Sequence, residues 1–292
     1  MHDSFNIKNI TSPNGATAEF APELGAICSS LILNNRELLF QHNFFWDKNS
    51  RKTRGGIPFL FPICGRLERN GKLGTYLYEN KLYEMPAHGF ADKMPWNVLE
   101  QKDDSEIMFE LTHTENTIVQ FPFQFRILLN YKITDNSLTA TVTFKNTGEK
   151  AMPFYAGFHP YFFTKLEQKE NILFNAAPTY SIQYNEKCND VIGTKKCPEL
   201  PLPVTSPALT DLLMRTGNKK AAQIIFPDNF KINISTSIDD IDFPYIQLYT
   251  LKDEPFFCVE PWMGAPNTLN SVTGSKWILP GESQSAKMTI SI

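Results

Sequence analysis

The chain has 292 residues and a formal net charge of −3, with 42% hydrophobic, 13% aromatic and 20% charged residues. This composition indicates a folded globular protein of one large domain or two ordinary ones, and it excludes a disordered chain and a highly charged binding module. No block of about five like charges occurs, so we expect no nucleic-acid partner, and no apolar run approaches about 18 residues, so we expect no membrane span.

The N-terminus and the cysteines predict a cytoplasmic protein. The opening residues, MHDSFNIKNI, lack the basic and apolar segments of a secretion signal. The cysteines are Cys28, Cys64, Cys188, Cys197 and Cys258. They are widely scattered and form no C-x-x-C pair, so we expect free thiols in a reducing compartment rather than disulfides or a zinc site.

Alternation of apolar and polar residues predicts β-strands through the first half of the chain. An apolar run at 26–33 predicts an early strand. Segments 105–113 and 124–134 carry apolar side chains at every second position, and 138–145 repeats the pattern with threonines on the outer face. Turn sequences follow the last two segments. These segments predict an antiparallel meander with one solvated face.

The second half continues the β pattern, apart from one Pro-rich segment and one candidate helix. The Pro-rich segment 197–207 is interpreted as a surface loop because strand-like runs flank it. Segment 210–217, TDLLMRTG, is the best candidate for a short helix. Further strands are predicted at 222–226, 230–236, 245–251 and 287–292. We therefore predict an all-β protein, a single large antiparallel β-sandwich domain spanning residues 1–292.

Two arginines and a histidine interrupt the β pattern in the first third of the chain. Arg54 precedes two glycines and Arg66 follows one, and they enclose an apolar run that contains two prolines. His88 precedes a glycine in AHGFAD. Each has an ordinary interpretation, because most arginines are exposed and a histidine beside a glycine fits a turn.

His159 and Glu260 are harder to explain as structural residues. His159 lies in GFHPYF, where Pro160 removes a backbone donor and the imidazole needs partners for two ring nitrogens. It is either satisfied by the backbone beneath a loop or presented in a cleft. Glu260 ends an apolar strand in CVEPWMG, two residues after Cys258, and is either solvated at a loop mouth or used in chemistry.

These residues together suggest a carbohydrate site. The chain contains no phosphate-binding loop, dinucleotide glycine motif, nucleophile elbow or metal-binding helix motif. It offers a candidate acid, a candidate base, two arginines and several aromatic residues. Aromatic faces with few polar groups suit sugar rings, which present apolar C–H faces and hydroxyl edges. A small-molecule sugar or sugar phosphate is therefore the expected ligand.

Four motifs occur in the order found in the aldose 1-epimerase, or galactose mutarotase-like, superfamily. They are GGIPFLFPICGRL, HGFA with PW shortly after it, GFHPYF and VEPWMGAPN, within residues 54 to 267. The chain resembles that superfamily throughout. The resemblance implies a large antiparallel β-sandwich with the sugar bound in a cleft on one sheet.

The resemblance also implies an acid–base mechanism that requires no metal and no organic cofactor. By motif match, Glu260 removes the proton of the anomeric hydroxyl while His159 protonates the ring oxygen. The ring opens, the anomeric carbon rotates, and the ring closes as the other anomer. Such positioned acid and base groups each typically accelerate a reaction about 10²- to 10⁴-fold.

Further residues are carried over from the same resemblance. His88 and Arg66 match residues that hydrogen-bond the sugar. Asp211 lies where the family carries an aspartate that binds sugar hydroxyls, and Asp228 is the alternative for that role. The resemblance therefore implies that His88, Arg66 and Asp211 bind the substrate.

The substrate stays open between a free aldose and a hexose 6-phosphate. Arg54 before the glycine pair resembles the hexose-6-phosphate epimerase branch, in which arginines bind the phosphate. Asp92, however, stands in HGFAD where the family often has an arginine. A second alternative, a carbohydrate-binding or regulatory protein without turnover, would need the aromatic residues, Arg66 and His88 but no matched acid and base.

Overall fold

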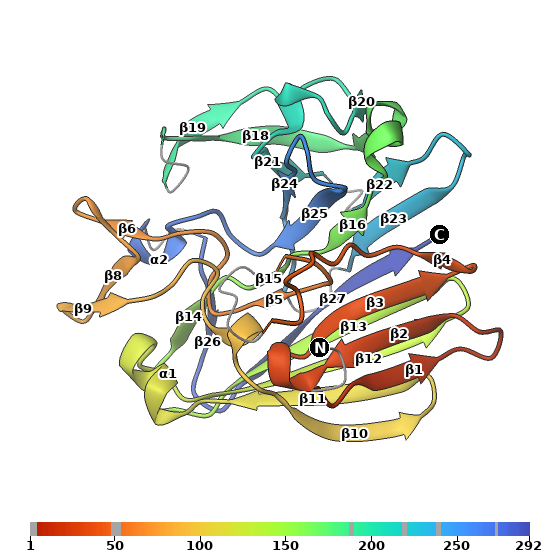
Figure 1. The fold of residues 1–292 in the computed structure, drawn as a ribbon. Coiled ribbons are helices and arrows are strands. Elements are labelled where there is room, and N and C mark those ends of the chain that lie inside the picture. Colours follow the sequence, from red (N-terminus) through yellow and green to blue (C-terminus); the bar gives the residue numbers. More distant parts are fainter. Residues whose placement is uncertain (1–4, 48–53, 187–189, 218–220, 238–240, 272–273) are drawn as a thin grey trace.

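Two large antiparallel sheets dominate the computed structural model, which describes residues 5–47, 54–186, 190–217, 221–237, 241–271 and 274–292 (Figure 1). The prediction of an all-β antiparallel sandwich is confirmed. Four cysteines are free thiols, and Cys188 lies outside the described residues. Neither helix in the described ranges is long and apolar enough to cross a membrane.

The nine-stranded sheet runs in the order β10 (Asn97–Asp103), β11 (Glu106–Thr112), β12 (Phe125–Thr134), β13 (Ser137–Asn146), β27 (Ser283–Ser291), β23 (Lys231–Thr236), β22 (Ala221–Ile225), β17 (Leu173–Ala176) and β20 (Leu202–Pro203). The eight-stranded sheet runs in the order β19 (Val191–Lys195), β18 (Pro178–Tyr184), β21 (Leu213–Thr216), β24 (Tyr245–Tyr249), β25 (Phe256–Trp262), β15 (Gly157–Phe158) and β5 (Phe59–Leu60), and β16 (Tyr161–Phe163) also pairs with β25.

Smaller elements complete the described fold. A four-stranded sheet contains β1 (Lys8–Thr11), β2 (Thr17–Ala21), β3 (Ile27–Leu33) and β4 (Arg36–Glu37). Three strand pairs are β14 (Met152–Phe154) with β26 (Lys276–Ile278), β6 (Glu68–Arg69) with β7 (Lys72–Leu73), and β8 (Thr75–Tyr78) with β9 (Lys81–Glu84). The two α-helices are α1 (Glu115–Gln120) and α2 (Thr268–Ser271).

The predicted meander forms strands β11, β12 and β13. Its register opposes apolar residues on one face, for example Ile127 with Phe144 and Leu129 with Val142. These side chains are buried, whereas the alternating threonines of β13 are partly exposed. Successive side chains of a strand point to opposite faces, so the sequence pattern fixes which face covers the core.

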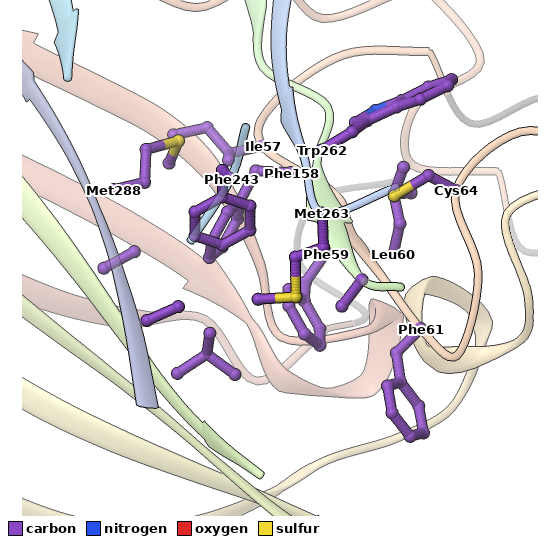
Figure 2. Packing of buried hydrophobic residues seen from close by; sticks show 14 of the residues in the cluster. Ile57, Phe59, Leu60, Phe61, Cys64, Phe158, Phe243, Trp262, Met263 and Met288 are labelled. Carbon is purple, nitrogen blue, oxygen red and sulfur yellow. The ribbon is translucent and has the colours of Figure 1, made fainter. Parts of the chain in front are cut away.

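The core between the two large sheets is rich in aromatic side chains. Figure 2 shows Phe59, Phe158 and Trp262 from the eight-stranded sheet, with Met288 of β27 in the same cluster. Phe61 follows β5 and is fully buried. The packing of Phe59 and Phe158 supports the eight-stranded sheet from the side opposite the pocket described below, whereas Trp262 also lines that pocket.

One local prediction is wrong, and one helix was not predicted. The predicted helix at 210–217 is wrong, because Leu213–Thr216 forms strand β21 between β18 and β24. Leu213 and Met214 are fully buried there, and pairing on both sides outweighs the weak helical preference of the segment. Helix α1 lies in a segment for which no helix was predicted, and Thr114 caps it in a capping box with Thr117.

Candidate functional site

A pocket of about 440 Å³ lies over the eight-stranded sheet, and the six site residues predicted from the sequence all line it. They are Arg54, Arg66, His88, His159, Asp211 and Glu260. These residues come from segments spread over more than two-thirds of the chain, so it is the strand order that brings them together. The catalytic and sugar-binding roles assigned to them from the sequence are predictions.

The strand register places His159 across from Glu260. Strands β15 and β16, before and after the His159–Pro160 break, both pair with β25 in one continuous register. Directly opposed side chains in an antiparallel pair lie on the same face, with Cβ atoms about 4.5–5.5 Å apart. His159 Nε2 accordingly lies 3.3 Å from Glu260 Oε1. His159 and Pro160 lie between the two strands. Because the register is the same on both sides, His159 stays opposite Glu260.

Glu260 is held at the base of the pocket with only 1% of its surface exposed. Gln247 of β24 opposes it on the other side, and Trp262 Nε1 donates a hydrogen bond to its Oε2 at 3.1 Å. Burial raises the pKa of Glu260 well above its ordinary value; the Trp262 hydrogen bond opposes this shift, and the charge of Asp211 adds to it. When ionised, Glu260 is therefore a stronger base than an exposed glutamate.

His159 is buried among aromatic rings. Its imidazole stacks on Tyr161, with ring centroids 4.6 Å apart and planes at 5°, and its backbone N–H donates to Pro58 O at 2.9 Å. Burial lowers the pKa of His159 well below its ordinary value, and His88 acts in the same direction. When protonated, His159 is therefore a stronger acid than a solvated imidazolium.

His88 is positioned as a neutral hydrogen-bond donor. It adopts the left-handed conformation, φ 65°, and Gly65 N–H donates to its Nδ1 at 3.2 Å, which assigns the ring hydrogen to Nε2. Burial lowers the pKa of His88 to about 4, and Lys93 and Arg66 contribute. A neutral His88 with its hydrogen on Nε2 can donate to a sugar hydroxyl across the physiological pH range.

Asp211, rather than Asp228, lies in the pocket. Asp211 begins the turn into β21 in a left-handed conformation, φ 49°. Burial raises the pKa of Asp211, and Arg66 opposes that shift. Asp228 is exposed and receives a 3.0 Å hydrogen bond from Arg36 away from this pocket. The structure therefore does not bring the alternative aspartate to the site.

The two arginines act on different sides of the pocket. The charge of Arg54 acts on Tyr161 and Tyr249, and that of Arg66 on His88 and Asp211. Arg54 Nη1 lies 4.0 Å from Glu254 Oε1, beyond hydrogen-bond distance. Its guanidinium therefore has hydrogen-bonding capacity to offer an oxyanion.

Asp92 adds no cation to this pocket. It is partly buried and lies outside the lining residues, with Lys93 Nζ 3.8 Å from its Oδ1. Burial raises the pKa of Asp92 to about 6, and Lys93 opposes this shift. Arg54 and Arg66 are thus the two guanidinium groups of the pocket in the described part of the chain.

Several lining residues were not predicted from the sequence. They are Tyr184, Glu186, Gln247 and Tyr249, from β18, the segment after it, and β24. Tyr184 Oη donates to Gln247 Oε1 at 3.0 Å, and Gln247 Nε2 donates to Leu248 O at 2.9 Å. For Gln247 the sequence did contain an indication. A glutamine in the middle of an otherwise apolar strand, YIQLY, needs a buried polar partner.

Trp262→Phe is expected to lower kcat/KM and to move the basic limb of its pH profile to higher pH. Because burial raises the pKa of Glu260 and lowers that of His159, the basic limb follows the loss of the proton from Glu260. The variant keeps an aromatic ring but removes the hydrogen bond that lowers the pKa of Glu260, so ionisation of the base requires higher pH. Rates measured from about pH 4 to 9 test this. A basic limb that stays in place, or moves to lower pH, would show that Glu260 does not govern it.

Comparison with known proteins gives a consistent result. The family model for aldose 1-epimerase matches residues 8–291. The crystal structure of the Slr1438 protein from Synechocystis sp. PCC 6803 is similar at a TM-score of 0.86 and 30% identity, covering 98% of this chain and 95% of that one.

Two curated proteins are also similar to the chain. The plasmid-encoded LacX of Lactococcus lactis subsp. lactis is 25% identical over 252 residues, covering 77% of this chain and 79% of LacX. An Escherichia coli K12 protein named "Putative glucose-6-phosphate 1-epimerase" is 26% identical over 179 residues, which cover 56% of each chain.

Proposed function

Because this chain belongs to the aldose 1-epimerase family, we propose that it interconverts the α and β anomers of an aldohexose by acid–base opening of the sugar ring. The observation that carries the proposal is the 3.3 Å contact between His159 Nε2 and Glu260 Oε1 at the base of a pocket large enough for a hexose. Polarimetry on freshly dissolved α-glucose tests it, since enzyme should shorten the approach to equilibrium.

The reaction begins from ionised Glu260 and protonated His159. Glu260 takes the proton of the C1 hydroxyl, the C1–O bond to the ring oxygen breaks, and His159 gives its proton to that oxygen. The open-chain aldehyde then rotates about the C1–C2 bond. Ring closure returns both protons by the reverse transfers, so the enzyme is unchanged and each anomer is reached from the other.

Burial supports both proton transfers. It raises the pKa of Glu260 and lowers that of His159. During ring opening Glu260 gains a proton and His159 loses one, so each group moves to its favoured neutral form. The neutral pair carries the same number of protons as the ion pair, and the 3.3 Å contact stabilises the ionised state that the reaction needs. The two groups titrate as one coupled unit.

The surrounding side chains offer hydrogen bonds and aromatic surface to a bound sugar. His88 offers a neutral N–H, Asp211 offers acceptors for hydroxyl hydrogens, and Arg66 offers guanidinium donors. Trp262 and Tyr249 provide aromatic surface for C–H groups. A protein that only binds sugar would need these groups but would gain nothing from a buried acid and base in contact, which favours turnover over binding alone.

We further propose that Arg54 binds the phosphate when the hexose carries one at C6. Support comes from its position in the pocket lining beside a carboxylate that it does not hydrogen-bond, and from similarity to a protein named as a glucose-6-phosphate 1-epimerase. Guanidinium groups bind phosphate oxygens through two parallel hydrogen bonds. A free aldose would leave this arginine with only the 4.0 Å ion pair to Glu254.

Arg54→Gln is expected to lower kcat/KM for glucose 6-phosphate about 10- to 100-fold, because a hydrogen bond to a charged group contributes about 1.5–3 kcal/mol. The same variant should change kcat/KM for glucose little. Arg69→Gln, in β6 and outside the pocket lining, is the matched control. Equal losses of kcat/KM with both sugars would mean that Arg54 stabilises the structure of the pocket rather than binding the phosphate.

A further inference from the structure

We propose that the base of the pocket is also a binding site for a soft divalent cation such as Zn²⁺, held by His159 Nε2, Cys258 Sγ and a carboxylate oxygen of Glu260, and that the ion excludes the sugar. These three ligand atoms lie within 4.8 Å of one another. The expected loss of activity and the competition between ion and sugar rest on the proposed function. Binding of the ion does not depend on it.

The strand register builds this ligand set. Cys258 and Glu260 are two residues apart on β25, so their side chains leave the same face of the sheet. Tyr161 pairs with Cys258, and His159, two residues earlier, lies across from Glu260. Two ligands therefore come from β25 and the third from the short segment between β15 and β16, both of which pair with β25, which gives a partly organised site.

The distances suit tetrahedral coordination after a small closure. Zinc bonds of about 2.0–2.3 Å place neighbouring ligand atoms about 3.3–3.8 Å apart. The 3.3 Å separation between His159 Nε2 and Glu260 Oε1 already matches, and Cys258 Sγ must approach by no more than about 1.5 Å. His159 and Glu260 line the pocket, so the fourth position faces its interior, where water can complete the shell.

Charge also favours a soft dication over other ions. Neutral imidazole, thiolate and carboxylate together balance a charge of two, and the ion replaces the thiol and carboxyl protons, which pass to solvent. The buried site then stays neutral, which avoids the cost of an uncompensated charge. A nitrogen, sulfur and oxygen set selects Zn²⁺ and disfavours Mg²⁺ and Ca²⁺, which prefer oxygen ligands.

Bound Zn²⁺ would block the chemistry directly. It would occupy the nitrogen lone pair of His159 that must carry the transferred proton, and it would coordinate the carboxylate of Glu260 that must accept one. Cys258 takes no part in the proposed proton transfers and does not line the pocket. It therefore offers a way to remove the metal site without removing the acid or the base.

Zinc binding to the intact chain, measured by competition with a chromogenic chelator, tests the proposal. Wild type and Cys64→Ala should bind alike, since Cys64 is an equally buried free thiol outside the ligand group. Cys258→Ala and the nearly isosteric Cys258→Ser should each weaken the tightest site at least about tenfold. Saturating sugar should also weaken zinc binding in the wild type, and Mg²⁺ should not compete.

Activity supplies the second readout. Micromolar Zn²⁺ should inhibit wild type and Cys64→Ala, while both Cys258 variants should keep their basal rate and resist inhibition. Equal zinc affinity in wild type and both Cys258 variants would overturn the proposal. If the wild type showed no turnover with any sugar, the proposed function would fail, and the chelator competition would still decide whether the metal site exists.

Discussion

Glu260→Gln is expected to lower the rate of anomer interconversion by about 10²- to 10⁴-fold, the usual contribution of a positioned general base. The amide keeps the shape of the carboxyl group but cannot accept the proton of the C1 hydroxyl. Sugar affinity should be retained, because His88, Asp211 and Arg66 also line the pocket and would hydrogen-bond the sugar independently of Glu260. Initial rates by polarimetry and affinities by calorimetry separate the two effects.

The same variant should be at least as stable as the wild type at pH 7. Burial raises the pKa of Glu260 above its ordinary value of 4.5, so the ionised carboxylate opposes folding as pH rises above the unfolded-state value. Below that value both states are protonated and the difference disappears. Thermal unfolding at pH 7 and pH 4 measures this, and a higher Tm only at pH 7 is the expected result.

Asp228→Asn is the matched control, because it makes the same carboxyl-to-amide change on an exposed residue outside the pocket. Its activity and Tm should stay close to those of the wild type. A Glu260→Gln variant that kept most of its activity would remove Glu260 from the reaction. Loss of activity accompanied by a large fall in Tm would instead point to a structural role.

Phe61→Ala is expected to reduce the free energy of unfolding by about 3–5 kcal/mol. The ring is completely buried and contacts five other aromatic rings. They belong to Phe90, Phe121, Phe125, Phe144 and Phe154. Truncation leaves a cavity that this closely packed cluster, part of the core shown in Figure 2, can fill only in part.

Urea unfolding measures this loss, with the slope of the transition showing whether the unfolded reference has changed. Phe61→Leu should lose less because more volume is kept. Phe44→Ala, at a side chain that is 58% exposed, should stay within about 0.5 kcal/mol of the wild type. A Phe61→Ala loss below about 1 kcal/mol would mean that the neighbouring rings collapse into the space.

The sandwich was predictable because its strands alternate clearly. Across β12 and β13, Ile127, Leu129 and Ile133 each oppose a buried apolar residue, so the pattern specifies both the strand and its buried face. The error at 210–217 has the opposite cause. Leu212, Leu213 and Met214 are three successive buried residues, and a short apolar run does not distinguish a helix from a strand paired on both sides.

Six of the residues that line the pocket were predictable from the sequence, but their geometry was not. His159 and Glu260 stood out because neither fits an apolar strand without a partner. That each opposes the other depends on the register of β15, β16 and β25, which the sequence does not reveal across the break at Pro160. Gln247 was missed because its partner, Tyr184, comes from β18, and pairing between distant segments is not a local signal.

Exchange NMR at anomeric equilibrium is the most direct test of the central claim, that the His159–Glu260 pair opens and closes a sugar ring. Glucose, galactose and glucose 6-phosphate should be measured in parallel with wild type, with Glu260→Gln and in buffer. The account predicts faster α–β exchange with wild type for at least one sugar and near-buffer rates with the variant. Exchange no faster than in buffer for all three sugars, despite detectable binding, would contradict it.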